Sequence, residues 1–344
     1  MTTVFLTGAS GYIGKHITLQ LLSAGYTVRA SVRSSAKGTE VVEALRSHLE
    51  NPELLETHLS FVELDLTSDA GWSEALQGVD ALLHTASPFT IDPVKDENVL
   101  IRPAVDGTLR ALKAAHAAGV QRVVLTSSVA AIQGRLLPEG KSEFDESMWT
   151  DVNSPLGNVP YTKSKTLAEE AAWNFVKHEA PEMQLTTINP SLVLGAPLDR
   201  NFGTSVAVLE RLLSAKDPAL PDVSFSIVDV SDVAALHVRS LDEAETVGQR
   251  YVASAGALTF IEMAKVLKAA YPKRKIVTRK APKLLLQILA LFDSQIKAIL
   301  PSLGKRTHIS SAKAQSTFAM EFIAPAQSVV DTAAFLLQEP PAKS

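Results

Sequence analysis

The chain has 344 residues, which is enough for one large α/β domain or for a cofactor domain with a smaller lobe. Its hydrophobic content of 46% and charged content of 20% are ordinary for a folded protein, and a net charge of -4 argues against a nucleic-acid-binding surface. The sequence contains no cysteine, which excludes disulfides, thiolate nucleophiles and cysteine-ligated metals.

The N-terminal sequence MTTVFLTGAS has no basic stretch ahead of its first apolar run, so it predicts a strand rather than a signal peptide. The most apolar later run, 284–292, is shorter than the ~20 residues that a membrane span needs, and Gln287 interrupts it. We interpret this run as one face of a buried helix. The expectation is a soluble cytoplasmic protein, monomer or homodimer, that binds neither a membrane nor a nucleic acid.

The first half of the chain alternates short aliphatic runs with amphipathic stretches. The aliphatic runs predict strands at 3–6, 27–32, 60–63, 81–84, 123–125 and 185–188. The amphipathic stretches predict helices at 15–24, 41–49, 105–118 and 163–177, with Gly25 and Gly119 where two of them end. This alternation is typical of an α/β fold with a Rossmann-type, doubly wound parallel sheet and helices on both faces.

Beyond Pro190 the alternation weakens, because recurrent prolines divide the rest of the chain into short elements. We assign residues 1–189, approximately, to a dinucleotide-binding Rossmann domain. Residues 190–338 are expected to form mainly a smaller C-terminal substrate-binding lobe, which can interleave with the first domain. This lobe would complete a cleft over the carboxyl edge of the sheet, where open α/β sheets bind ligands. Residues 339–344 are expected to be a frayed tail.

A glycine-rich segment, TGASGYIG at 7–14, follows the first predicted strand and opens the first predicted helix. Gly8, Gly11 and Gly14 allow a tight turn, a close approach of the backbone to a pyrophosphate, and close packing of helix on strand. The N–H groups at the start of the helix then face the phosphate. The spacing GxxGxxG differs from the GxGxxG fingerprint and also occurs in ordinary strand–helix turns. Its position directly between strand and helix favours a dinucleotide-binding loop.

The residue that ends the second strand of such a fold reads the adenosine ribose: an acid selects NAD, and a nearby arginine accepts the 2′-phosphate of NADP. Here that strand ends near Arg33, and no carboxylate occurs between Gly14 and Glu40. A guanidinium matches a phosphate in a bidentate manner, and Lys37 adds a second charge. The alternative is that both are solvated loop charges. The sequence favours NADP(H) as the cofactor.

A tyrosine and a lysine four residues apart, Tyr161 and Lys165, fall on one face of a helix. A phenol with a pKa of about 10 is a poor acid–base catalyst at neutral pH unless a cation stabilises its phenolate, and Lys165 supplies one. An apolar strand upstream ends in Ser127 and Ser128, which places a hydroxyl where it can bind a carbonyl oxygen. Each feature alone also fits a plain strand end or a surface helix. With the glycine-rich loop, they predict Ser128, Tyr161 and Lys165 as the catalytic residues.

Several other polar residues are interpreted as structural. A second Tyr-x-x-x-Lys match, Tyr271 and Lys275, contains a proline that disfavours a continuous helix, so we set it aside. His84 is interpreted as a hydrogen-bonded residue at a strand end. The histidines show no metal-ligand spacing, and no metal site is expected. The acidic pairs at 145–146 and 169–170 are interpreted as solvated charges.

The glycine-rich loop, the serine at the strand end and the tyrosine–lysine pair resemble those of the extended short-chain dehydrogenase/reductases. Within that family, the sequence is most similar to the branch of dihydroflavonol reductases, cinnamoyl-CoA reductases and aldehyde or ketone reductases. The similarity covers nearly the whole chain. The string HTASPF at 84–89 is more specific to this branch than the glycine-rich loop is. The similarity is carried by segments 7–14, 28–33, 65–66, 84–89, 126–128, 145–149, 161–165 and 189–195.

The resemblance implies further site residues beside Ser128, Tyr161 and Lys165, for the cofactor and for the substrate. For the cofactor it implies Tyr12 and Ile13 beside the pyrophosphate, Asp65 and Leu66 near the adenine, Ala86 along the dinucleotide, Pro190 at the nicotinamide carboxamide, and Tyr161 and Lys165 themselves. For the substrate it implies Phe89, Gln133 and the loop 195–205, together with Ser128 and Tyr161.

Two departures from the family pattern matter. Many relatives carry an asparagine in an Asn-Val-x-Gly-Thr string as a fourth catalytic residue, but here 104–108 reads AVDGT, which puts a proton relay through asparagine in doubt. The Asn-Trp-Tyr-Cys string typical of cinnamoyl-CoA reductases is also missing, and 158–161 reads NVPY. CoA thioesters therefore rank lower as substrates.

The resemblance implies an NADPH-dependent oxidoreductase that reduces an aldehyde or ketone carbonyl to an alcohol, with Tyr161 as the proton donor and a small carbonyl compound as substrate. Two alternatives remain. An NAD-dependent nucleotide-sugar epimerase or dehydratase shares the glycine-rich loop and the tyrosine–lysine pair, but Arg33 argues against it. A non-catalytic dinucleotide-binding sensor would usually lack the tyrosine or the lysine. The sequence leaves the choice among carbonyl substrates open.

Overall fold

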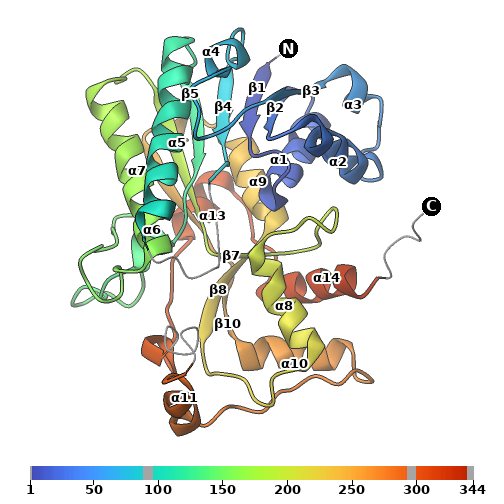
Figure 1. Cartoon of the computed structure of the whole chain (residues 1–344), viewed down its shortest axis with the longest axis vertical. Helices are drawn as coiled ribbons and strands as arrows, with labels where there is room; N and C mark the ends of the chain where they lie inside the picture. The colour runs from blue at the N-terminus through green and yellow to red at the C-terminus, as the bar shows by residue number, and fades with distance from the viewer. Residues whose placement is uncertain (1, 88–95, 293–299, 339–344) are drawn as a thin grey trace.

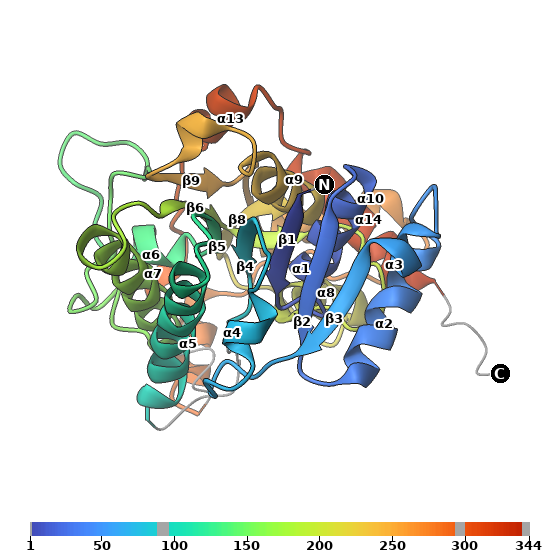
Figure 2. The same ribbon diagram turned by 90° about the horizontal axis from the view of Figure 1, so that it is seen from above.

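The structure is a computed structural model that describes residues 2–87, 96–292 and 300–338. Its larger part is a seven-stranded sheet in the order β3-β2-β1-β4-β5-β6-β9, and each neighbouring pair is parallel. Helices cover both faces of this sheet (Figures 1 and 2), which confirms the predicted Rossmann-type, doubly wound architecture. The strands are β1 (Thr3–Thr7), β2 (Thr27–Val32), β3 (Leu59–Glu63), β4 (Ala81–His84), β5 (Arg122–Thr126), β6 (Gln184–Pro190) and β9 (Gln249–Ala253).

The strands form where short aliphatic runs can be buried on both faces, as parallel sheets require. In β1 the side chains of Val4, Phe5 and Leu6 are all fully buried and alternate between the faces. Val4 and Leu6 belong to one hydrophobic core, and Phe5 belongs to the core on the opposite face. The first core is lined by α1 (Tyr12–Ser23), α2 (Ser35–Arg46) and α9 (Val230–Arg239), and the second by α4 (Trp72–Ala75), α5 (Asn98–Ala117) and α7 (Pro160–His178).

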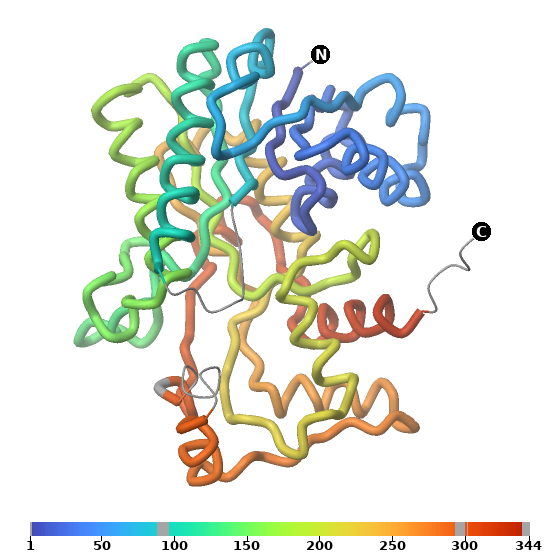
Figure 3. Tube along the Cα trace, viewed as in Figure 1, coloured from blue at the N-terminus to red at the C-terminus, as the bar shows by residue number. Residues whose placement is uncertain are grey.

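A three-stranded sheet in the order β10-β8-β7 forms the smaller part, which lies below the large sheet in Figure 1. The trace in Figure 3 shows that the chain passes between the two parts more than once, because β9 and α9 return to the large sheet. The elements of the smaller part are β7 (Leu192–Leu194), β8 (Ser224–Asp229), β10 (Gly256–Thr259), α8 (Thr204–Ser214), α10 (Phe260–Ala270) and α14 (Pro325–Leu337). Short helices are α3 (Leu54–Thr57), α6 (Ala130–Gln133), α11 (Lys283–Leu289), α13 (Ala312–Phe318) and the 3-10 turns Ala244–Thr246 and Leu300–Ser302.

The predicted helix ends at two glycines are confirmed. Gly25 and Gly119 follow α1 and α5 with φ angles of 84° and 77°, a left-handed conformation that glycine adopts without strain. All four predicted helix starts were too late, because α1 begins at residue 12, α2 at 35, α5 at 98 and α7 at 160. A proline lies inside the second turn of α5. The predicted frayed tail, 339–344, lies outside the described residues.

The prediction of a buried helix for the apolar run 284–292 was wrong. The helix α11 buries only Leu286 and the following Ala290, whereas Leu284, Leu291 and Phe292 are 70%, 78% and 86% exposed. A short helix that touches the protein with about one residue per turn leaves its other faces in solvent. Within the described part of the chain, no helix is both long and apolar enough to cross a bilayer.

Candidate active site

The carboxyl end of β5 presents the first predicted catalytic hydroxyl. The strand ends at residue 126, and the next main-chain N–H, that of Ser127, still donates to the carbonyl oxygen of Ile188 on β6, at 2.7 Å. Ser128 therefore stands at the sheet edge between two central strands. Its hydroxyl oxygen accepts the N–H of Ala130 at 3.1 Å, and the residue is buried. The serine is thus held by the backbone of its own turn.

The first turn of α7 brings the second hydroxyl to the same place. The helix begins at Pro160, a residue suited to the first helical position because it needs no N–H partner there. Tyr161 follows directly, and its phenol is hydrogen-bonded to the Ser128 side chain. Lys165 lies one helical turn further along the same face. The structure therefore brings together the three residues predicted to be catalytic.

Burial governs the charge states of this group. It raises the pKa of Tyr161, and the hydrogen bond with Ser128 lowers that pKa to a smaller extent. Burial lowers the pKa of Lys165 to about 8, and the negative charge of Glu169 acts in the opposite direction. The expected lowering of the phenol's pKa by Lys165 is not seen, because burial dominates. At neutral pH the phenol is protonated, as a proton donor must be, and Lys165 is mostly charged.

His84 lies at the end of β4 and is hydrogen-bonded there, as predicted. Its Nδ1 hydrogen-bonds the hydroxyl of Thr7 at 2.8 Å, and the same hydroxyl oxygen accepts the N–H groups of Thr85 and Ala86. Burial, with a smaller effect from the charge of Lys165, lowers the pKa of His84 to about 3, so the ring is neutral. Among the described residues, no group of histidines and acids is arranged to hold a metal ion.

The glycine-rich turn between β1 and α1 is closely packed on one side and open on the other. Gly8 has a φ angle of 73°, and a β-carbon there would lie 2.9 Å from the backbone of Ala86. At Gly14 a β-carbon would lie 2.2 Å from the Gly8 carbonyl oxygen. At Gly11 it would meet only that oxygen, at 3.2 Å. The open side of the turn is therefore the side of Gly11, the N-terminal cap of α1.

The open side of this turn suits a pyrophosphate. Gly11 provides no side-chain cap, and the N–H groups of Tyr12 and Ile13 have no hydrogen-bond partner in the described part of the chain. Free N–H groups at the positive end of a helix dipole form an anion site. The residues present thus fit the phosphates of a dinucleotide.

Alanine substitutions should separate the two roles of these glycines. We expect Gly14→Ala to lower the free energy of unfolding by about 1–3 kcal/mol, because its methyl group collides with backbone that cannot move cheaply. We expect Gly11→Ala to leave stability nearly unchanged and to weaken NADPH binding, because its methyl group extends into the open side. Urea unfolding and NADPH fluorescence titration measure the two effects. Equal stability losses in both variants would contradict this assignment.

The side chain of Tyr12 joins α1 to the loop that follows β7. Its hydroxyl donates to the carbonyl oxygen of Gly195 at 2.8 Å, and only its main-chain N–H remains at the glycine-rich turn. The buried Lys15 on the next turn of α1 pairs with Asp199 at 2.5 Å. The first part of the loop 195–205, predicted to border the substrate, is therefore tied to α1.

The predicted adenosine-binding residues lie at the ends of β2 and β3. Arg33 is exposed directly after β2. Hydrogen bonds from Thr67 lower the pKa of Asp65, and the nearby charge of Arg33 adds to this effect. Lys37 pairs with Glu40 at 2.6 Å. Because Lys37 already has an anionic partner, Arg33 is the better placed of the two cations for a 2′-phosphate.

The remaining predicted site residues have these positions. Leu66 packs beside the second core, next to α5. Pro190 ends β6, and its carbonyl oxygen accepts the N–H of Val129, next to the serine, at 3.0 Å. Gln133 ends α6 and is half-buried. Phe89 lies outside the described residues.

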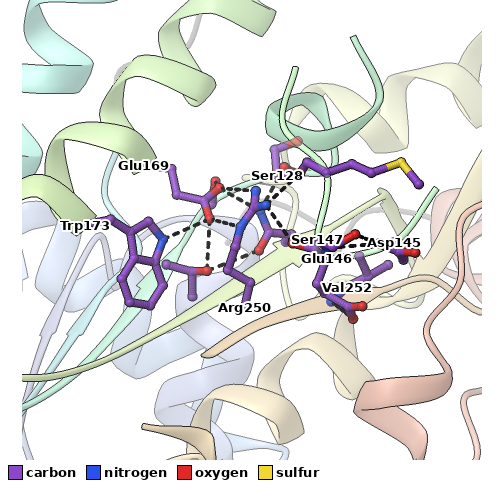
Figure 4. A network of polar contacts seen from close by, with 12 residues as sticks. Ser128, Asp145, Glu146, Ser147, Glu169, Trp173, Arg250 and Val252 are labelled. Atoms are coloured by element: carbon purple, nitrogen blue, oxygen red, sulfur yellow. Dashed lines mark hydrogen bonds and ion pairs between the residues drawn. The ribbon is translucent and has the colours of Figure 1, made fainter. Parts of the chain in front are cut away.

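Sequence reasoning missed a buried ion pair, Glu169 with Arg250, whose network reaches Ser128 (Figure 4). The interpretation of 169–170 as solvated charges is wrong for Glu169, which is 1% exposed and pairs with Arg250 at 2.7 Å. The interpretation of 145–146 is wrong for Glu146, which is half-buried and accepts the N–H of Val252. One signal was available: Glu169 follows Lys165 at helical spacing and so shares its face.

A parallel sheet with a glycine-rich turn after its first strand and a serine–tyrosine–lysine group at its carboxyl edge is typical of dinucleotide-dependent oxidoreductases of the short-chain dehydrogenase/reductase type. A family model described as the NAD dependent epimerase/dehydratase family matches residues 4–254. The chain belongs to this family, that of the extended short-chain dehydrogenases/reductases, as the sequence resemblance implied.

Curated relatives and solved structures agree with this family. An uncharacterized oxidoreductase of Schizosaccharomyces pombe is 34% identical over 80% of this chain and 84% of its own length. A cinnamoyl-CoA reductase of Medicago truncatula is 35% identical over 79% of this chain and 82% of its own length. The yeast methylglyoxal/isovaleraldehyde reductase Gre2, solved with NADPH, is 26% identical with a TM-score of 0.80 over 98% of both chains. Gre2 of Candida albicans, also solved with NADPH, is 28% identical with a TM-score of 0.80, and the match covers 98% of this chain and 99% of that one.

Proposed function

We propose that this chain is an NADPH-dependent reductase that converts an aldehyde or a ketone to the corresponding alcohol. The observation that carries the proposal is the hydrogen-bonded pair of Ser128 and Tyr161 at the sheet edge, with Lys165 one turn further along α7. Two converging hydroxyls suit the oxygen of a carbonyl, and a nearby cation favours the negative charge that develops when that oxygen is reduced.

The cofactor assignment rests on two sites of this chain and on its relatives. The free N–H groups of Tyr12 and Ile13 suit the pyrophosphate, and Arg33 suits the 2′-phosphate. The Gre2 proteins of yeast and Candida albicans are solved as NADPH complexes. When bound, this cofactor supplies the hydride for the carbonyl carbon.

Ser128 and Tyr161 then bind the carbonyl oxygen, and Tyr161 protonates it. The Ser128 hydroxyl donates a hydrogen bond to that oxygen and holds it beside Tyr161. The Tyr161 phenol donates its proton to the same oxygen, so that the alcohol forms and the charge is neutralised in place. The positive charge of Lys165 offsets part of the cost of burying the phenolate that remains until solvent returns the proton.

An NADPH-oxidation screen over a broad panel of aldehydes, ketones and CoA thioesters tests the proposal. Turnover of aldehydes or ketones is the expected result, and turnover of CoA thioesters alone would overturn the substrate class. NADPH binding without any turnover would favour a non-catalytic sensor. NAD that remains bound through purification would favour an epimerase or dehydratase.

Arg33→Asp should shift the cofactor preference towards NADH. We expect the ratio of kcat/KM for NADPH to that for NADH to fall by about 10- to 100-fold, because hydrogen bonds to charged groups contribute about 1.5–3 kcal/mol. Lys37→Ala serves as the matched control and should change the ratio less, since Lys37 already pairs with Glu40. An unchanged ratio in Arg33→Asp would show that Arg33 does not read the phosphate.

A further inference from the structure

The carboxylate of Glu169 is the centre of a buried polar network that the proposed mechanism does not use (Figure 4). The residue lies on α7, one turn beyond Lys165. A buried carboxylate is costly unless its oxygens are paired and hydrogen-bonded, and here both oxygens are. Side-chain donors to them are Ser127, Trp173, Thr187, Asn189 and Arg250.

One branch of the network reaches the catalytic serine. The side-chain amide of Asn189 donates to Glu169 at 2.7 Å and to the main-chain oxygen of Ser128 at 3.1 Å. The hydroxyl of Ser127 donates to the same carboxylate oxygen at 2.5 Å. Two consecutive residues of the strand end are therefore attached to one anion. This attachment fixes the backbone from which the Ser128 hydroxyl reaches Tyr161.

A second branch is electrostatic and acts on Lys165. The negative charge of Glu169 favours the charged form of this lysine, whereas burial favours the neutral form. A small cavity of about 10 Å³, which is room for about one water molecule, is lined by both residues and by Thr108. The other titratable groups facing the lysine in the described structure are Tyr161 on the same helix and the neutral His84 on β4.

A third branch anchors the carboxylate. Arg250 on β9 pairs with Glu169, and its remaining N–H groups donate to the main-chain oxygens of Glu146 and Met148 at 2.9 and 2.7 Å. Its guanidinium also lies over the ring of Trp149, 3.8 Å from the ring centroid. The arginine thus joins α7 to the last strand of the large sheet and to the segment 146–149. Glu169 cannot turn away without leaving a buried cation unpaired.

We propose that Glu169, held by Arg250, is a positioning residue that fixes the Ser128 backbone and supplies the negative charge that Lys165 faces. The inference rests on the proposed reductase function for its effect on turnover. Its electrostatic part concerns the lysine alone and can be measured without turnover.

The test compares Glu169→Gln with Glu170→Gln. Both remove one carboxylate charge from adjacent positions of α7. Glu170 is half-exposed and makes no hydrogen bond to the network in the described structure; only the charges of Glu169 and Arg250 act on it, in opposite directions on its pKa. Glutamine at 169 keeps an oxygen for Ser127 and Asn189, but its NH2 group then meets the donors Thr187 and Arg250, which shifts the side chain and the backbone that it holds. We expect kcat to fall by about 10- to 100-fold in Glu169→Gln, the scale of a small misplacement of a catalytic group, and to stay unchanged in Glu170→Gln.

The pH dependence separates positioning from simple support of the fold. In the parent protein, Lys165 loses its proton as the pH rises through about 8. Without the carboxylate charge, the pKa of Lys165 is lower, so the decline of kcat/KM with rising pH should begin at a lower pH. Acetylation of Lys165 in the protein without cofactor, followed against pH by mass spectrometry, should show the same displacement.

The outcomes are distinct. A folded Glu169→Gln variant whose kcat, pH profile and Lys165 labelling match those of Glu170→Gln would overturn the inference. If Glu169→Gln does not fold, the double variant Glu169→Gln/Arg250→Met, which leaves no unpaired charge, is measured in its place. If the parent protein reduces no carbonyl, the proposed function fails, and the labelling profile alone still decides the electrostatic part.

Discussion

Tyr161→Phe is expected to lower kcat by roughly 10²–10⁴-fold, the range typical of a positioned proton donor. The phenol is the only group that changes, and the phenylalanine ring fills the same space at the start of α7. The hydroxyl that this variant lacks is the one paired with Ser128. Turnover of the best substrate from the screen, followed by NADPH oxidation, measures the loss.

Two controls accompany this variant. NADPH affinity, from fluorescence titration, should be nearly unchanged, because the glycine-rich turn and Arg33 lie elsewhere. Tyr271→Phe makes the same change in the second Tyr-x-x-x-Lys match, where α10 has already ended, and should keep full activity. Retained turnover in Tyr161→Phe would refute its role as proton donor.

The elements that could be predicted depend on signals a few residues long. Strands of the large sheet are aliphatic runs separated by amphipathic stretches, and Gly25 and Gly119 mark helix ends through their backbone conformation. The proximity of Tyr161 and Lys165 follows from one helical turn. Ser128 joins them because parallel strands present their carboxyl ends at one edge. The family resemblance then supplied the roles of these residues, which local patterns do not state.

The elements that escaped prediction depend on distant partners. Glu169 and Arg250 are 81 positions apart, and they meet because β6 pairs with β9 and α7 covers that part of the sheet. No local pattern around position 250 indicates this pairing. Tyr12 likewise reaches Gly195, 183 positions away. The prediction that α11 is buried failed for a related reason. Apolar composition indicates that burial would be favourable, but whether another part of the chain covers the helix depends on distant residues.

Arg250→Met is expected to lower the free energy of unfolding by about 3–5 kcal/mol. The variant leaves Glu169 buried and charged, and removes the donors for the carbonyl oxygens of Glu146 and Met148. Urea unfolding at neutral pH measures the loss. The matched control is Arg211→Met, which removes the same charge from an exposed pair with Asp217 and should cost at most about 1 kcal/mol.

The partner substitution shows whether unpaired charge causes this loss. Glu169→Gln/Arg250→Met has no buried charge left at the pair, and its amide oxygen still accepts from Ser127 and Asn189, so most of the lost stability should return. Turnover should not return with it, because Lys165 then lacks the charge that Glu169 provided. A double variant as unstable as Arg250→Met would instead assign the loss to the packing of Arg250 on Trp149. The double variant should therefore recover stability without recovering turnover. Uncharged side chains can replace the packing and hydrogen bonds of the ion pair, but they cannot replace the negative charge of Glu169 that acts on Lys165.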